Sequence, residues 1–138
     1  MLDSTALKNI PLFAHLSDAE LAQLQAVLTE RRLKAGDILF NMGDLGEELF
    51  IVREGRVAIY SPNPETPGNE QPIRIFDPGE ALGEMALIDR QPRSLSARAL
   101  EPAVLLALTG KEFHRLLGAH PELALSVMSG LSDRIRYT

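Results

Sequence analysis

Closely spaced glycines in the first half of the chain are the feature that most limits how it can fold. Between residues 32 and 60 they separate short apolar runs at 38–40, 49–52 and 56–60. The glycines are Gly36, Gly43, Gly46 and Gly55. Runs of this length suit strands better than helices, and glycine between them is typical of turns that reverse the chain. The pattern predicts an antiparallel β-barrel or jelly roll, the double-stranded β-helix.

Alternation within the later runs predicts which side chains face the barrel interior. Val57 and Ile59 share one face of their strand, and Ile73 shares a face with Ile75. We expect both pairs to point inward. Residues 61–72 hold four prolines and one glycine, which predicts a surface loop without a function of its own.

Helices are predicted at both ends of the chain. Residues 17–20 have the spacing of a capping box, and the helix that they open is expected to end near Glu30. Residues 109–112 form a second capping box, which opens a helix that stops near Gly118. We therefore expect one α+β domain over residues 1–138: helices in 1–31, a barrel in 32–109 with strands at 96–99 and 104–108, and helices in 110–138.

The last helix is predicted to begin at Pro121 and carries an apolar stripe. Leu125, Met128, Leu131 and Ile135 recur at intervals of three and four residues. Such a stripe suits either packing against the barrel or a homodimer interface. Packing against the barrel is the favoured interpretation, because every helix beside a barrel needs an apolar face.

Composition excludes several classes of function. The net charge of −5, without a lysine-rich run, argues against direct nucleic-acid binding. The longest apolar run, residues 103–108, is far shorter than the roughly 20 residues of a membrane-spanning helix. The start of the chain lacks the features of a secretory signal and the chain has no cysteine, so a cytoplasmic domain is expected.

The ionisable residues do not suggest an enzyme or a metal site. His15, His114 and His120 lie outside the predicted strands and lack metal-ligand spacing. Glu47 and Glu48 are neighbours on a predicted strand, so their side chains point to opposite faces. We expect no catalytic activity, no metal and no cofactor.

A short segment after the predicted barrel turn combines the groups that bind a ribose phosphate. Gly83 suits a turn, and the helix formers after it present backbone N–H groups that attract an anion. Arg93 follows nine residues after Glu84, and a guanidinium can bind two phosphate oxygens side by side. Glu84 would repel a phosphate, so it is better suited to accept a hydrogen bond from a sugar hydroxyl.

At these residues the chain resembles the phosphate-binding cassette of the cyclic nucleotide-binding domain family. The matching residues are Gly83-Glu84-Met85-Ala86-Leu87-Ile88 and Pro92-Arg93-Ser94, within residues 82–96. The family includes the catabolite activator protein, protein kinase A regulatory subunits and cyclic nucleotide-gated channels. The segments 35–40, 43–44, 48–52 and 54–57 resemble its opening strands and glycine turns, so the likeness covers nearly the whole chain.

The resemblance implies a role for each cassette residue and a ligand. Gly83 and Glu84 would bind the ribose 2′-hydroxyl, Met85 and Ala86 would form the backbone beside the cyclic phosphate, and Arg93 and Ser94 would bind its oxygens. The ligand would be cAMP, with cGMP as the alternative.

The nucleotide base also needs an apolar wall and a lid. Val57, Ile59 and Ile73 are the candidates for the wall. By resemblance, Arg134 and Thr138 of the last helix are the candidates for the lid.

These expectations describe a regulatory domain that binds a cyclic nucleotide and relays occupancy through its last helix. The output domain would lie outside this chain. The alternative is an interaction module of the same fold that dimerises through the last helix and has an empty or occluded pocket. Leu95, where the family has a small alanine, favours this alternative because added methylenes crowd a packed site.

Overall fold

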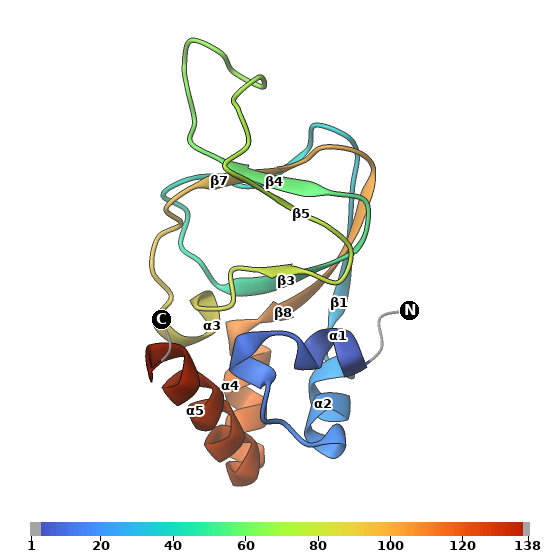
Figure 1. Ribbon diagram of the computed structural model, residues 1–138, viewed down its shortest axis with the longest axis vertical. Helices are drawn as coiled ribbons and strands as arrows, with labels where there is room; N and C mark the ends of the chain where they lie inside the picture. Colours follow the sequence, from blue (N-terminus) through green and yellow to red (C-terminus); the bar gives the residue numbers. More distant parts are fainter. Residues whose placement is uncertain (1–3, 137–138) are drawn as a thin grey trace.

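Two antiparallel sheets face each other, and helices cover one end of them, in the computed structural model, which describes residues 4–136 (Figure 1). The strands are β1 (Thr29–Leu33), β2 (Ile38–Phe40), β3 (Glu48–Glu54), β4 (Val57–Tyr60), β5 (Arg74–Phe76), β6 (Ala81–Leu82), β7 (Ser96–Ala99) and β8 (Ala103–Thr109). One sheet has the order β1-β8-β3-β6 and the other β2-β7-β4-β5. The predicted jelly roll with flanking helices is confirmed.

The helices gather at one end of the sheets (Figure 1). They are α1 (Ser4–Lys8), the 3₁₀ turn η1 (Pro11–Phe13), α2 (Asp18–Gln25), α3 (Ala86–Asp89), α4 (Gly110–Ala119) and α5 (Pro121–Arg136). The capping box predicted at residues 17–20 is confirmed, because Ser17 and Glu20 make both of its reciprocal bonds. At residues 109–112 only half of the predicted box forms: the Thr109 hydroxyl accepts from Glu112 N, whereas the Glu112 carboxylate accepts from Arg115. These caps satisfy N–H groups that helix starts leave without a partner.

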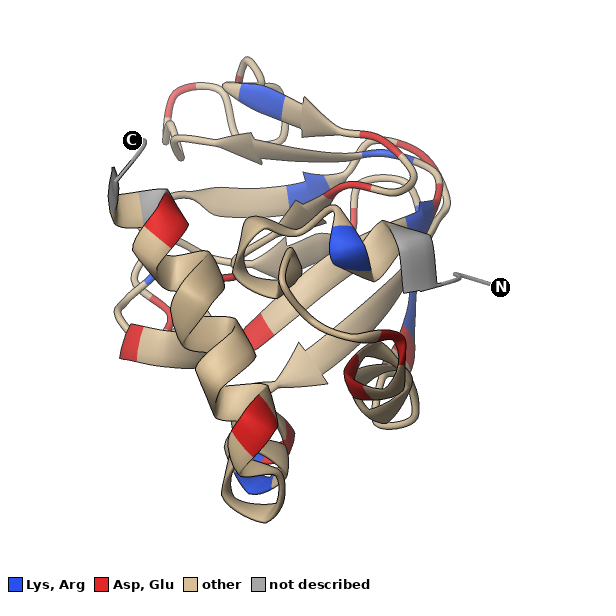
Figure 2. Ribbon diagram, turned by 60° about the horizontal axis from the view of Figure 1, so that its bottom comes forward, with Lys and Arg blue, Asp and Glu red and all other residues tan. Residues whose placement is uncertain are grey.

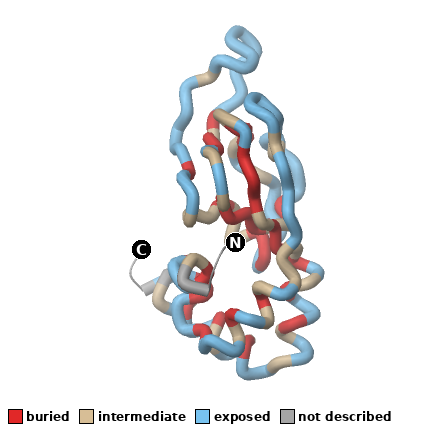
Figure 3. The backbone as a smooth tube through the Cα atoms, turned by 90° about the vertical axis from the view of Figure 1, so that its right-hand side faces the viewer, coloured by how far each residue is buried: buried red, intermediate tan, exposed pale blue. Residues whose placement is uncertain are grey.

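Strand β3 contributes to two separate cores. Its residues Leu49 and Ile51 pack with the helices, whereas Phe50 and Val52 point between the sheets. This division follows from the alternation of side chains along a strand. Figure 3 shows the buried residues along these strands and in the helical layer.

The first strand was not predicted from the sequence. The helix expected to reach Glu30 ends at Gln25, and β1 begins at Thr29 and pairs with β8. The predicted boundary between the N-terminal helices and the barrel, after residue 31, is therefore wrong. β1 has the sequence TERRL and is exposed except for its half-buried last residue, so it lacks the apolar alternation that identifies a strand.

Strand β5 faces the interior with the opposite residues to those predicted. Ile59 pairs with Arg74 and Val57 pairs with Phe76, so Arg74 and Phe76 point to the same side as Val57 and Ile59. Ile73 is 59% exposed. The expectation that Ile73 and Ile75 line the interior is wrong, because the alternation alone does not say which face of a strand is inside.

The proline-rich loop over residues 61–72 is exposed, as predicted, and stands away from the sheets (Figure 3). The carboxylate of Glu70 nevertheless organises it, accepting hydrogen bonds from the backbone N–H groups of Asn63 and Gly68 and from Arg98. These bonds, first among them that from Asn63, hold the pKa of Glu70 below its usual range. The loop is thus tied to strand β7.

The stripe predicted on α5 does not pack against the barrel. Leu125, Met128 and Ile135 are 65%, 61% and 74% exposed, and Leu131 packs partly on the helical core. The favoured interpretation as core packing is therefore wrong for the three exposed residues. The buried side of α5 instead carries Leu123, which is fully buried, together with Val127 and Gly130.

Helix α5 docks on the N-terminal segment through its glycine. A Cβ at Gly130 would lie 2.7 Å from the Leu12 carbonyl oxygen and 2.8 Å from that of Pro11. Ser126 Oγ donates to Glu20 Oε1 at 3.0 Å, and His15 Nε2 contacts Asp133 Oδ2. The absence of a side chain at Gly130 therefore allows α5 to lie directly on the backbone of η1.

Candidate ligand-binding site

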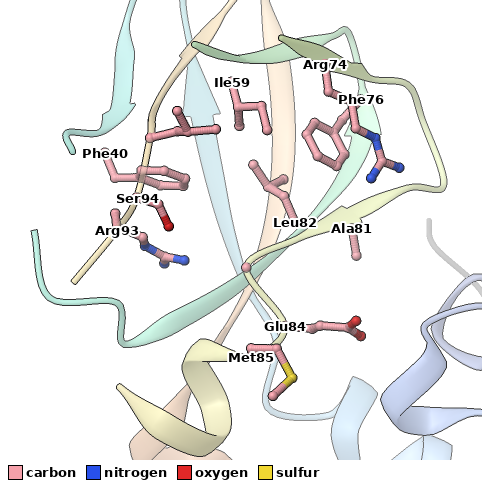
Figure 4. Close-up of a pocket in the computed structure, with 12 residues that line it drawn as sticks. Phe40, Ile59, Arg74, Phe76, Ala81, Leu82, Glu84, Met85, Arg93 and Ser94 are labelled. Atoms are coloured by element: carbon pink, nitrogen blue, oxygen red, sulfur yellow. The ribbon is translucent and has the colours of Figure 1, made fainter. Parts of the chain in front are cut away.

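A cavity of about 300 Å³ opens where the two sheets meet the segment after β6 (Figure 4). Phe40, Arg93 and Ser94 form one side of it, and Arg74 and Phe76 form the opposite side. The remaining lining residues are Ile59, Ala81, Leu82, Gly83, Glu84, Met85 and Leu95. The cavity therefore has apolar walls and two arginines on facing sides.

The segment from Gly83 to α3 turns the chain sharply under this cavity. Gly83 has φ +83°, a left-handed conformation that side chains disfavour, and a Cβ there would lie 2.5 Å from Arg93 Nη1. Ala86 N donates to the Gly83 carbonyl at 3.1 Å. The turn therefore requires glycine for its conformation and for the close approach of the arginine.

Arg93 is held in one position by contacts on several sides. Its guanidinium carbon lies 4.3 Å from the centre of the Phe40 ring, and Nη2 donates to the Glu48 carbonyl oxygen at 2.7 Å. A Cβ at Gly46 would lie 3.2 Å from its Nε. Burial lowers the pKa of Arg93 from its ordinary value, and the carboxylates of Glu48 and Asp44 partly offset this. The result is a partly desolvated cation at the cavity, which favours an anionic ligand.

Five of the six predicted cassette residues line this one cavity. They are Gly83, Glu84, Met85, Arg93 and Ser94. Glu84 points away from Arg93 in Figure 4 and also lines a neighbouring cavity of about 630 Å³ beside residues 9–11. Ala86 is only 7% exposed, and its N–H already donates to Gly83, so contact with a phosphate would require that bond to be shared or released.

The predicted base wall is only partly present. Ile59 lines the cavity, whereas Val57 is fully buried in the core between the sheets and Ile73 points outward. Val57 and Ile59 do share a face, but Val57 lies beside Phe76. Phe76, and not Val57, therefore lines this part of the cavity.

Sequence reasoning missed three of the wall residues, Phe40, Arg74 and Phe76. Phe40 stands at the end of a short predicted strand, and its position two residues after Ile38 was the available signal. Arg74 stands between two isoleucines that the alternation predicts to point inward, so the same pattern directs Arg74 outward. A charged side chain can face inward where its strand borders an open cavity.

The predicted lid residues are not part of the described site. Thr138 lies outside the described residues, and the side chain of Arg134 is outside the description as well. Among the side chains of α5 that are described, none lines the cavity. In this structure α5 lies on the N-terminal segment instead.

Residues 4–136 contain neither a metal-binding cluster nor a membrane-spanning helix. No group of three or more histidine or acidic side chains in this part of the chain is placed to hold a metal ion. No helix within the same residues has both the length and the apolarity to cross a membrane.

Comparisons with known proteins agree on one family. The sequence model of the cyclic nucleotide-binding domain matches residues 30–120. A cyclic nucleotide-gated potassium channel of Mesorhizobium japonicum is 36% identical over 115 residues, which are 83% of this chain and 30% of the channel. The cyclic AMP receptor protein of Thermus thermophilus is 33% identical over 130 residues, 94% of this chain and 59% of that protein.

A solved structure matches over most of both chains. The N-terminal domain of a transcriptional regulator from Streptomyces coelicolor A3(2) superposes with a TM-score of 0.85 at 36% identity, covering 95% of this chain and 92% of that one. The jelly roll and the arginine beside its turn define a regulatory ligand-binding domain. This chain belongs to the cyclic nucleotide-binding domain family. It spans 30% and 59% of the length of the two relatives above.

Proposed function

We propose that this chain is a cytoplasmic sensor domain that binds a 3′,5′-cyclic nucleotide, cAMP, in the cavity beside Arg93. The observation that carries the proposal is the partly desolvated guanidinium of Arg93, fixed by Phe40 and the Glu48 carbonyl at the edge of an apolar cavity. A relative that is 33% identical over 94% of this chain is named a cyclic AMP receptor protein, which supports cAMP as the ligand.

Each part of the nucleotide has a matching group in the cavity. Arg93 and Ser94 bind the cyclic phosphate, because a charged fork and a hydroxyl both donate to its oxygens. Glu84 accepts from the ribose 2′-hydroxyl after its carboxylate turns toward the cavity. Ile59 and Phe76 provide the apolar wall for the base.

Occupancy of the cavity reaches the last helix through α3 and α4. His114 Nε2, on α4, donates to the Leu87 carbonyl oxygen, on α3, at 2.8 Å. α4 leads directly into α5 at His120, so a shift of the cassette helix is transmitted to both. The ligand favours the conformation that it contacts best.

The outer face of α5 is the proposed surface for a second copy of the chain. Between Glu122 and Asp133 it has no charged residue, and Figure 2 shows this uncharged length of helix. Leu125, Met128 and Ile135 are exposed along it. The output domain that responds to α5 is proposed to lie outside this chain.

The alternative function is an interaction module that binds no nucleotide. Leu95 was the sequence feature in its favour, and Leu95 does line the cavity. A cavity of about 300 Å³ nevertheless remains beside it. The open cavity and the held arginine favour ligand binding over the alternative.

Calorimetric titration of the folded chain with cAMP tests the proposal. We expect saturable one-site binding at micromolar concentration or tighter, and weaker binding of 2′-deoxy-cAMP because Glu84 then lacks its hydroxyl donor. A flat titration at high protein concentration would favour the interaction module.

The second arginine of the cavity leads to a prediction about base selectivity. The guanidinium of Arg74 lies 4.3 Å from the centre of the Phe76 ring, and its Nη2 donates to Glu80 Oε2 at 3.3 Å. Guanidinium groups only donate, which suits the O6 acceptor of guanine better than the amino group that adenine carries at the same position, whereas N7 accepts in both bases. We expect Arg74→Leu to weaken cGMP binding by about 1 kcal/mol, roughly fivefold, and to leave cAMP binding nearly unchanged.

Cyclic inosine monophosphate separates this effect from contacts to the 2-amino group of guanine, because it keeps O6 and N7 but lacks that amino group. Its affinity should fall with that of cGMP in Arg74→Leu. Arg56→Leu is the matched control, since Arg56 is half-exposed and pairs with Glu101 at 3.8 Å, outside the cavity. An equal loss for cAMP and cGMP would mean that Arg74 attracts the ligand only by its charge.

A further inference from the structure

Phe40 is the nearer of two aromatic rings that flank the phosphate-binding candidate Arg93. The guanidinium carbon of Arg93 is 4.3 Å from the centre of the Phe40 ring and 5.9 Å from that of Phe50. The two rings stack, with centres 6.2 Å apart and planes inclined by 26°. Phe50 is 2% exposed and belongs to the core between the sheets. Phe40 is therefore packed beside a buried ring, and both rings lie near the guanidinium of Arg93.

Of the two rings beside the guanidinium of Arg93, Phe40 is the one close enough to cover a face of it. Gly83 and Gly46 lie against Nη1 and Nε and have no side chains. The Glu48 carbonyl accepts from Nη2 at 2.7 Å. An aromatic face attracts a cation above it, and the attraction grows when water is excluded. Stacking on Phe40 also keeps the N–H edge of the planar guanidinium turned toward the cavity.

We propose that Phe40 is a positioning residue for the phosphate: its ring, packed beside Phe50, holds the guanidinium of Arg93 in the orientation that binds the anionic oxygens. The proposal rests on the proposed function, in which Arg93 binds the phosphate of a cyclic nucleotide. Ordering this long side chain before the ligand arrives removes an entropy cost from binding. Phe40 acts on the ligand through Arg93.

A double-mutant cycle measured by calorimetry with cAMP tests the coupling of the two residues. Phe40→Leu keeps an apolar side chain but removes the aromatic face, and we expect it to weaken binding about tenfold. Phe40→Tyr retains the face and should bind within about threefold of the wild type. In the Arg93→Gln background, Phe40→Leu should cause little further loss, because no cation remains to be positioned.

Phe76→Leu is the matched control, because it removes an aromatic ring from the opposite wall of the same cavity. Its effect on affinity should be the same with and without Arg93. If Phe40→Leu weakens binding equally in both backgrounds, Phe40 only fills the cavity or contacts the nucleotide, and the proposal is wrong. No loss in Phe40→Leu would overturn it as well.

Nuclear magnetic resonance of the ligand-free protein provides a readout that does not need the nucleotide. The Arg93 Nε–H signal, assigned by its absence in Arg93→Gln, should be shifted upfield by the Phe40 ring and should lose that shift in Phe40→Leu but not in Phe76→Leu. A flat wild-type titration with the shift present would refute the nucleotide ligand and support the positioning contact. An Arg93 signal that is the same in wild type and Phe40→Leu would refute the positioning contact.

Discussion

Replacing Arg93 with alanine is expected to weaken cAMP binding by about 1.5 to 3 kcal/mol, which is roughly 10- to 150-fold. The guanidinium is the cationic group of the predicted cassette, and it is already partly desolvated against Phe40. Alanine removes a charge-assisted contact to the phosphate. Because Arg93 is already partly desolvated in the free protein, its removal saves little desolvation cost on binding. Calorimetry at constant ionic strength measures the loss directly.

Arg93→Lys is expected to recover only part of this loss, because an ammonium cannot reproduce the planar fork that binds two oxygens. Arg56→Ala is the control for the change in net charge, since Arg56 lies outside the cavity. Circular dichroism should show that all three variants are folded. Equal affinity in Arg93→Ala and the wild type would mean that the phosphate binds elsewhere.

Gly130→Ala is expected to destabilise the fold by about 1 to 3 kcal/mol, the usual cost of forcing extra atoms into a packed contact. Alanine is normally the better helix former, so an exposed position would gain up to about 1 kcal/mol. Here the added Cβ would meet the carbonyl oxygens of Pro11 and Leu12 at less than 3 Å. Backbone atoms cannot rotate aside, so α5 must move away from η1.

Gly118→Ala is the matched control within the helical layer. A Cβ at Gly118 would have no atom within 4 Å, so we expect equal or greater stability there. Denaturant unfolding followed by circular dichroism gives the free energy of unfolding for both variants. If Gly130→Ala were as stable as Gly118→Ala, α5 would not lie on the N-terminal segment in solution.

Local signals in the sequence predicted the parts of the fold that depend on local chemistry. The hydroxyl caps at Ser17 and Thr109 formed because a hydroxyl three residues before a backbone N–H needs no tertiary partner to bond it. The cassette could be found for a related reason: Gly83 and Arg93 are residue types that few others can replace in a turn and an anion contact. Their convergence on one cavity needed the structure, because it depends on the Glu48 carbonyl of a distant strand.

The errors arose where a tertiary partner decides the outcome. β1 is a strand because β8 pairs with it, although its own residues are polar and exposed. Alternation in β5 could not say whether Arg74 or Ile75 faced inward, since that depends on the pairing with β4. Leu125 and Met128 have helical spacing, but Gly130 sets which side of α5 meets η1. Nothing in the sequence marks Gly130 as the place where two backbones come into close contact.

Hydrogen exchange of the chain with and without cAMP tests the central claim, that binding at the cassette is relayed to the last helix. The account predicts that amides of residues 83–94 become more protected on adding cAMP. It also predicts a change in the protection of α5 after Pro121, because His114 links α4 to the carbonyl of Leu87. Protection confined to residues 83–94, with α5 unchanged, would contradict the relay and leave a domain that binds its nucleotide without signalling through that helix.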